Sequence, residues 1–346
     1  MKLVLSPEQR ELRTAVRAFL TAGSPLPAVR AAFETEDGYS REVYARMNGE
    51  LGLAGLLVPE SFGGAGAGHA DLAVALEETG AALLPGPFLA TVFATIALTG
   101  AQDKDLLTGI AGGAITATYL TEGGLTASIG DGGLLIDGVA GHVLNGMDVD
   151  VILAETGQGL VAIDATAPGV TREALTTLDL TRRQAKITFE GVVARLIPGS
   201  TESVGDLIAV ALAAEQLGVL RASLENIVAY AKIRVAFGRY IGSYQGVKHK
   251  LADMHGKLEQ AESIVRYAAW AADCAPQELP EAAALAQAYV GRACFEVARD
   301  HLLLHGGIGF TWEHDAHLYY KRAKADEVLL GPPRKHRARL ADLLEL

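Results

Sequence analysis

The spacing of apolar residues changes twice along this chain, and this change limits the fold more than any other feature of the sequence. Apolar residues recur with helical spacing up to residue 113 and again from Val204 onward, while residues 114–198 alternate with a period of two. We therefore predict an α+β fold that is mostly α. Its three expected domains are residues 1–113 (α-helical), 114–200 (small antiparallel β domain) and 201–346 (α-helical).

Two further features support the helical segments. Ser6 can accept the unpaired amide hydrogens of a helix start, and Pro7 then stands at the first helical position, where its missing amide is tolerated. After the alternating segment, three long stretches are rich in Ala, Leu, Glu and Arg, and a four-helix bundle is their expected packing. These stretches are residues 206–235, 245–273 and 281–304.

Charge and cysteine content argue against several classes of function. The 346 residues carry a formal net charge of −11, which repels nucleic acid and anionic membranes. Cys274 and Cys294 belong to no CxxC motif or histidine cluster, so we expect neither a metal site nor a disulfide. The chain turns polar after its first five residues, unlike a secretory signal, and apolar stretches such as 85–100 are too short to span a bilayer. We expect a cytoplasmic protein without a membrane span.

Two stretches in the second half of the chain are distinctive. The first begins at Arg234 and reads RVAFGRYIGSYQGVKHKLADM, and the second, residues 305–323, reads HGGIGFTWEHDAHLYYKRA. In both stretches the chain resembles the acyl-CoA dehydrogenase family, and weaker similarity in LGLAGLLVPESFGG and DLTRRQAKITFEGV extends the resemblance over almost the whole chain. The resemblance implies an N-terminal helical domain, a middle β-barrel-like domain, a C-terminal four-helix bundle and bound FAD.

The resemblance also implies which residues contact the cofactor. These residues are Thr121, Arg234, Phe237, Gln245, His305, Gly306 and Gly307. Arg234 would offer a planar, multi-donor group to the pyrophosphate, Phe237 would lie near the adenine, and Gln245 would hydrogen-bond the adenosine half. The two glycines would let the backbone approach the dinucleotide closely. In the family these contacts cross a subunit interface and serve the partner's flavin. The alternatives are that Arg234 is an ordinary helix-end residue and that Phe237 belongs to the core.

The catalytic base of the family has no counterpart in this sequence. An acyl-CoA dehydrogenase removes the α proton of the thioester with a carboxylate while the β hydrogen leaves as hydride. Where most members have this glutamate the chain has Leu330, and where a minority have it the chain has Ile208. No catalytic residue is therefore assigned. Glu215, Asp326 and Glu327 could replace the base only if the backbone were shifted.

The flavin-facing part of the middle domain also departs from the family. A Trp-x-Thr/Ser motif of the family corresponds here to Val143-Leu144-Asn145. Thr121 keeps a hydroxyl that could face a flavin, and it can equally be an ordinary threonine at a strand end. We infer that the chain's own isoalloxazine site is eroded.

Three functions remain open at this point. The first is a non-catalytic partner in a heteromeric acyl-CoA dehydrogenase, such as the heterotetramers of actinobacterial steroid degradation, in which a homologous chain supplies the base. The second is a self-sufficient dehydrogenase with a displaced base, and the third is a flavin-free acyl-CoA-binding or scaffold protein. The resemblance further implies an acyl-CoA substrate, a homologous or identical partner in a dimer or tetramer, and electron-transfer flavoprotein as the electron acceptor.

Overall fold

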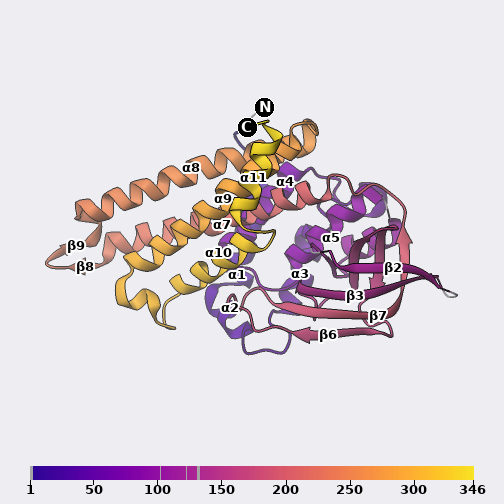
Figure 1. Cartoon of the computed structure of the whole chain (residues 1–346). Coiled ribbons are helices and arrows are strands. Elements are labelled where there is room, and N and C mark those ends of the chain that lie inside the picture. The colour runs from indigo at the N-terminus through magenta and orange to yellow at the C-terminus, as the bar shows by residue number, and fades with distance from the viewer. Residues whose placement is uncertain (1–2, 102, 122, 131–132) are drawn as a thin grey trace. The chain divides into compact units, whose positions relative to one another are not determined.

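Helices, strands and helices follow one another in the computed structural model in the predicted order (Figure 1). The structure describes residues 3–101, 103–121, 123–130 and 133–346. The first helices are α1 (Pro7–Gly23), α2 (Leu26–Ala32), α3 (Arg41–Leu51), α4 (His69–Ala81), α5 (Phe88–Ala101) and α6 (Lys104–Ala111). The strands are β1 (Ala117–Tyr119), β2 (Leu125–Gly130), β3 (Gly133–Leu144), β4 (Val151–Thr156), β5 (Gly159–Asp164), β6 (Val170–Ala174) and β7 (Gln184–Ile197). The later elements are α7 (Val204–Ile233), β8 (Val235–Ala236), β9 (Arg239–Tyr240), α8 (Gln245–Cys274), α9 (Leu279–Leu304), the short 3₁₀ helix η4 (Gly306–Phe310), α10 (Ala316–Val328) and α11 (Pro333–Leu343).

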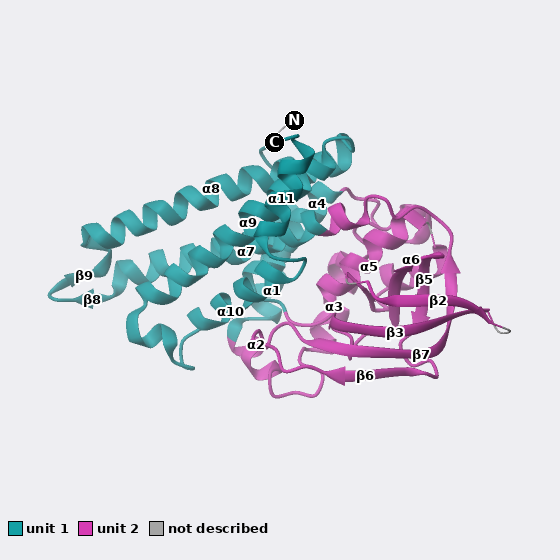
Figure 2. Cartoon of the chain, viewed as in Figure 1, with its two compact units in different colours: residues 1–26, 69–84, 209–346 teal, residues 27–68, 85–208 magenta. Residues whose placement is uncertain are grey.

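The chain forms two units, which Figure 2 shows in different colours. Unit 1 joins residues 1–26 and 69–84 to residues 209–346, so it contains α1 and α4 together with the helices that follow the sheet. Unit 2 joins residues 27–68 to residues 85–208 and contains the sheet with the other early helices. Residues 1–113 therefore contribute helices to both units.

The predicted start of the first helix is confirmed. The Ser6 hydroxyl accepts a hydrogen bond from the backbone amide of Gln9, and the Gln9 side chain accepts one from the backbone amide of Ser6. This reciprocal pair satisfies two amide hydrogens that the helix itself leaves unpaired. Pro7 occupies the first turn, as its fixed φ favours.

The seven-stranded sheet of unit 2 has the order β1-β4-β5-β7-β3-β2, with β6 paired to β7. Its pairs are antiparallel except for β1 and β4, which run parallel with Ala117 opposite Val151. The prediction of a purely antiparallel domain is therefore wrong at this edge. A parallel pair needs a long connection, and β2 and β3 supply it between the two strands.

The core of this sheet consists of alternate residues from neighbouring strands. Ile136 of β3, Val161 of β5 and Ile187 of β7 have no exposed side-chain surface and belong to one apolar cluster. Strands β1 and β2 stand at the two ends of the strand order, and no pairing joins them within the described residues. The expected β domain between the two helical segments is confirmed, and it is built on this central sheet.

Helix α7 is the most apolar long helix of unit 1. By length and composition it could cross a membrane, but 94% of its apolar window is buried inside the structure. Such burial is that of a core helix, whose apolar residues serve packing rather than contact with lipid. The remaining long helices, α8 and α9, complete the predicted bundle together with α10 (Figure 1).

Candidate functional site

A short hairpin joins the long helices α7 and α8 (Figure 1). Strands β8 and β9 pair and leave Phe237 and Gly238 as a two-residue loop. These loop residues have φ angles of 51° and 81°, the positive values that a type I′ turn requires. The phenol of Tyr244 donates a 2.8 Å hydrogen bond to the carbonyl of Ala236, and the guanidinium of Arg239 lies 3.9 Å from the centre of the Tyr244 ring. The hairpin is therefore fixed by its own contacts.

The hairpin exposes large apolar side chains. Phe237 is 97% exposed, and Ile233, Val235 and Tyr240 are also exposed. The alternative that Phe237 belongs to the core is therefore wrong. A bulky residue with positive φ is an outlier, and an exposed apolar group of this kind marks a contact surface for another molecule.

Arg234 and Gln245 flank this hairpin. The backbone amide of Arg234 donates to the carbonyl of Tyr230, and its carbonyl accepts from the amide of Ile241, while the Arg234 side chain is exposed. Gln245 is the first residue of α8 and is exposed as well. Fixed backbones with exposed polar side chains suit the recognition of a ligand or partner that approaches from outside the chain.

The end of α9 lies beside the end of α7 through an aromatic cluster. The ring centres of Tyr230 and His305 are 4.3 Å apart, and His305 is 4.2 Å from His314 and 4.8 Å from His301. His305 is buried, and its Nδ1 lies 2.8 Å from the carbonyl oxygen of His301. Burial lowers the pKa of His305, so the ring is held neutral within its own chain.

The ring of His301 is still more enclosed. Neither ring nitrogen has a hydrogen-bond partner in the part of the chain that the structure describes, and the side chain is 1% exposed. Burial, together with the neighbouring His305 and His314, lowers the pKa of His301 to about 3. The sequence analysis did not predict this histidine cluster. The one indication of it in the sequence is the spacing of His301 and His305, which lie one helical turn apart.

Gly306 and Gly307 follow His305 in the chain. Their surroundings show whether a dinucleotide could approach the backbone here. Gly306 has a φ of 68°, a backbone conformation that favours glycine over other residues. Gly307 has no such φ, and a Cβ at either position would meet no atom of the described residues within 4 Å. The chain's own packing therefore does not require a glycine at Gly307, whereas a closely approaching external group would. The glycines, the exposed Arg234 and the hairpin together fit one edge of FAD.

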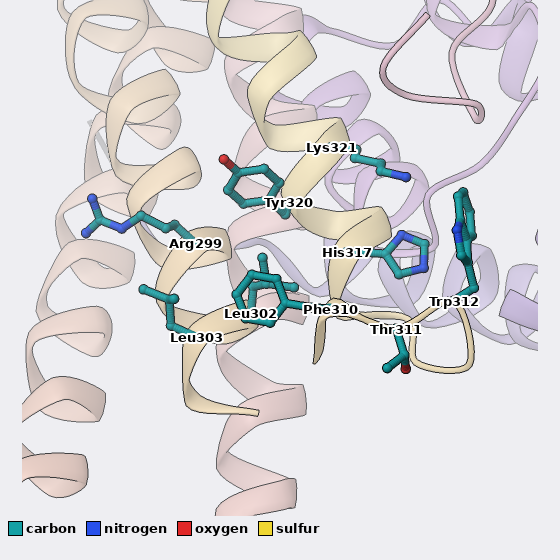
Figure 3. Close-up of a pocket in the computed structure, with 9 residues that line it drawn as sticks. All are labelled: Arg299, Leu302, Leu303, Phe310, Thr311, Trp312, His317, Tyr320 and Lys321. Carbon is teal, nitrogen blue, oxygen red and sulfur yellow. The ribbon is translucent and has the colours of Figure 1, made fainter. Parts of the chain in front are cut away.

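A pocket of about 390 Å³ lies on the other side of this segment, between α9 and α10 (Figure 3). Phe310, Leu302 and Tyr320 form apolar walls. The Lys321 ammonium lies 4.2 Å from the centre of the Trp312 ring, which also makes an edge contact with His317. Trp312 is 60% exposed, so this turn presents an aromatic surface in addition to linking the two helices.

The predicted flavin-facing residues of the middle domain lie elsewhere, in unit 2. Thr121 is exposed just after β1 and lines a hollow of about 10 Å³ together with Val143 and Leu144. That volume holds about one water molecule. Val143 and Leu144 are buried in the sheet and offer no aromatic platform.

Both positions of the expected base carry apolar side chains in well-defined surroundings. Ile208 is 1% exposed in α7. Leu330 follows α10, where its carbonyl oxygen lies 3.1 Å from Nε2 of His336, and Gly331 after it has a φ of 97°. Neither side chain can accept a proton.

The three candidate substitutes are buried in unit 1. Glu215 lies 3.2 Å from the guanidinium of Arg322, and Glu327 bonds Lys324 at 2.7 Å. Asp326 is 1% exposed, beside the buried Cys294, whose pKa is raised by burial and then by Asp326. Glu215 and Glu327 thus have structural partners, which argues against a role of either as a general base.

Comparison with known proteins decides the family. Residues 6–114 match the model of the acyl-CoA dehydrogenase N-terminal domain, and residues 207–344 match that of the acyl-CoA dehydrogenase C-terminal domain. The chain belongs to the acyl-CoA dehydrogenase family. This family consists of oxidoreductases that act on CH–CH bonds, and its proteins bind FAD. The mostly helical architecture with a central sheet is the fold of the family.

Several acyl-CoA dehydrogenases resemble this chain over its full length. IpdE2 of Mycolicibacterium smegmatis is 36% identical over 342 residues, which cover 97% of this chain and 98% of that protein. A chain of the ChsE4-ChsE5 complex from Mycobacterium tuberculosis superposes with a TM-score of 0.90 at 27% identity, covering 100% and 99% of the two chains. A chain of the Tcur3481-Tcur3483 steroid ACAD superposes with a TM-score of 0.88 at 29% identity, and the match covers 98% of each of the two chains. The protein is thus homologous to subunits of heteromeric steroid acyl-CoA dehydrogenases.

Proposed function

We propose that this chain is a non-catalytic subunit of a heteromeric acyl-CoA dehydrogenase, and that a homologous chain supplies the base. One observation supports the proposal: the two expected base positions carry the apolar residues Leu330 and Ile208, while the chain presents an exposed hairpin and a glycine segment. A chain that lost the family chemistry altogether would have no use for a strained, exposed Phe237. The exposed Phe237 therefore disfavours a flavin-free scaffold.

In the proposed complex Arg234, Gln245, Gly306 and Gly307 hold the adenosine and pyrophosphate half of FAD at the partner's active site. When bound, FAD supplies the acceptor for the hydride that leaves the β carbon. The exposed guanidinium of Arg234 would form charge-assisted hydrogen bonds with phosphate oxygens, and Phe237 would pack on the partner. His305 would hold the glycine segment in place through its contact with Tyr230 rather than touch FAD.

The substrate and the other partners follow from the relatives. One related protein is a steroid ACAD, so we propose the acyl-CoA thioester of a steroid-degradation intermediate as the substrate. The proposed assembly is a heterotetramer, the proposed electron acceptor is electron-transfer flavoprotein, and the proposed reaction takes place in the cytoplasm. A self-sufficient enzyme is disfavoured because Glu215 and Glu327 are held in ion pairs.

The test compares the chain expressed alone with the chain co-expressed with a neighbouring homologue. We expect half-stoichiometric FAD and acyl-CoA turnover only in the complex. Arg234→Ala should lower the FAD content of the complex, whereas Arg10→Ala, on the exposed face of α1, should not. Turnover by the chain alone, or by the chain carrying only Leu330→Glu, would contradict the partner role.

A further inference from the structure

A second pocket of unit 1 lies apart from the hairpin and the glycine segment. It has a volume of about 460 Å³ and is lined by residues of α1 and the turn after it, the end of α4, the middle of α7 and the start of α10. All of these residues belong to one unit, so the pocket is complete within it. Its volume falls within the range of small-molecule sites. We call it the Arg221 pocket, after the buried arginine in its lining.

Arg221 is a buried cation that lines this pocket. Its residue surface is 8% exposed, and its Nη2 pairs with Glu77 and lies 3.7 Å from Glu262. Nη1 of the same guanidinium is buried and has no hydrogen-bond partner among the residues that the structure describes. A buried donor without an acceptor is costly, and a charged one more so.

Arg17 lines the same pocket, and one of its donor groups is not used in its ion pair. It forms a two-pronged contact with Glu78, in which Nε and Nη2 donate to the two carboxylate oxygens at 2.8 Å. Its Nη1 is not used in that contact, and the side chain is 51% exposed. Two guanidinium groups in one pocket therefore retain capacity for a further acceptor.

Arg17 and Arg221 belong to an ion cluster at the pocket. Its ion pairs connect four arginines with three glutamates. The arginines are Arg13, Arg17, Arg221 and Arg266, and the glutamates are Glu77, Glu78 and Glu262. Glu225 also lines the pocket, but it is exposed to water, which screens its charge. An anion in the pocket would give the buried Nη1 of Arg221 an acceptor.

The lining also has an apolar part. Leu20, Leu26 and Ala82 contribute to it from three different segments, beside polar residues such as Thr21 and Ser24. An inorganic anion would leave this apolar surface exposed to water, whereas the apolar body of an organic acid would cover it. The carboxylate of that acid could accept two hydrogen bonds from one guanidinium, the geometry that arginine favours.

We propose that the Arg221 pocket binds an organic carboxylate with an apolar body, which places the carboxylate against Arg221 and Arg17. The site is separate from the proposed flavin contacts and does not depend on the proposed function. Asn226 also lines this pocket and is exposed.

Cyclohexanecarboxylate is a suitable probe, with the neutral cyclohexanecarboxamide as its match in shape. Titration calorimetry on the full chain, purified with its partner if the two form a complex, should show saturable binding of the acid. The amide should bind at least about tenfold more weakly, because it lacks the charge that pairs with a guanidinium. Equal affinity for both probes, or no saturable binding of the acid, would overturn the proposal.

Two variants locate the binding within the chain. Asn226→Asp adds a negative charge at the pocket and should weaken the acid about tenfold without changing the amide, while Gln158→Glu adds the same charge on an exposed turn of unit 2 and should change neither. Ala222→Phe should fill the pocket and abolish binding, with Ala229→Phe on the exposed face of α7 as its control and circular dichroism as the check of folding. Binding that survives Asn226→Asp unchanged would place the ligand elsewhere and refute the site.

Discussion

Gly218 of α7 faces the backbone of Glu77 in α4 so closely that a Cβ at Gly218 would overlap the carbonyl oxygen of Glu77. One turn away the relationship is reversed, because a Cβ at Gly80 of α4 would overlap the carbonyl oxygen of Glu215 in α7. The two helices therefore cross in direct backbone contact. This crossing joins a helix from the N-terminal part of the chain to the helical bundle of unit 1.

Gly218→Ala should separate these helices and lower the free energy of unfolding by about 3 kcal/mol or more, in the range of severe overpacking. The matched control is Gly256→Ala in α8, where a Cβ would meet no atom within 4 Å. That change should stabilise the chain by about 0.5–1 kcal/mol through helix propensity. Denaturant unfolding of both variants checks the contrast, and equal effects would show that the crossing is looser than described.

Glu215 should act in stability rather than in proton transfer. Glu215→Ala leaves the fully buried Arg322 without its 3.2 Å partner and should cost about 3–5 kcal/mol. Glu225→Ala, on the exposed side of the same helix, should change stability by less than about 0.5 kcal/mol. If Glu215→Gln kept the stability of the complex but lowered kcat by orders of magnitude, the partner role would give way to a displaced base.

His301 should make the chain sensitive to mild acid. Its pKa in the folded state is about 3, below the ordinary value of 6.5, so the unfolded state binds the proton more readily. Stability should fall as the pH drops below 6.5, by about 2 kcal/mol at pH 5 from this residue. His301→Phe should remove most of that loss between pH 7 and pH 5 in denaturant unfolding. Burial lowers the pKa of His305 as well, so a smaller loss of the same sign should remain.

His249→Gln, on the exposed surface of α8, is the control for this pH series. It should leave the pH dependence of the wild-type chain in place. An unchanged pH dependence in His301→Phe would show that His301 is not the group whose protonation is coupled to folding.

Phe237 should matter for assembly and not for the fold of the chain. Asn tolerates positive φ better than an aromatic residue does, so Phe237→Asn should leave the stability of the isolated chain unchanged or raise it by about 1 kcal/mol. The same variant should weaken association with the partner and FAD retention, since it removes a 97% exposed apolar anchor. Analytical ultracentrifugation with flavin absorbance measures both effects; undiminished assembly would remove Phe237 from the interface.

The two thiols should differ in reactivity. Cys274 is exposed, whereas Cys294 is buried and its pKa is raised well above the ordinary value, chiefly by burial. Ellman's reagent should therefore titrate one thiol rapidly in the native chain and two after denaturation. Rapid titration of both native thiols would show that the bundle opens around Cys294.

Much of the fold follows from local patterns. The capping box at Ser6, the change of apolar period and the long helices of the bundle depend on neighbours in sequence, so they could be predicted. The parallel pairing of β1 and β4 could not, because it depends on which distant strand edge remains free once β2 and β3 have paired elsewhere.

The candidate site divides in the same way. The sequence by itself determined the family, the apolar identity of Leu330 and Ile208 at the expected base positions, and the motif that begins at Arg234, because each of these is a matter of residue identity at a fixed spacing. Only the tertiary structure decided that Phe237 is exposed and that His305 packs inward on Tyr230. It also decided that Arg221 lines a pocket. Burial and pairing depend on residues far apart in sequence, and the folded chain alone brings those together.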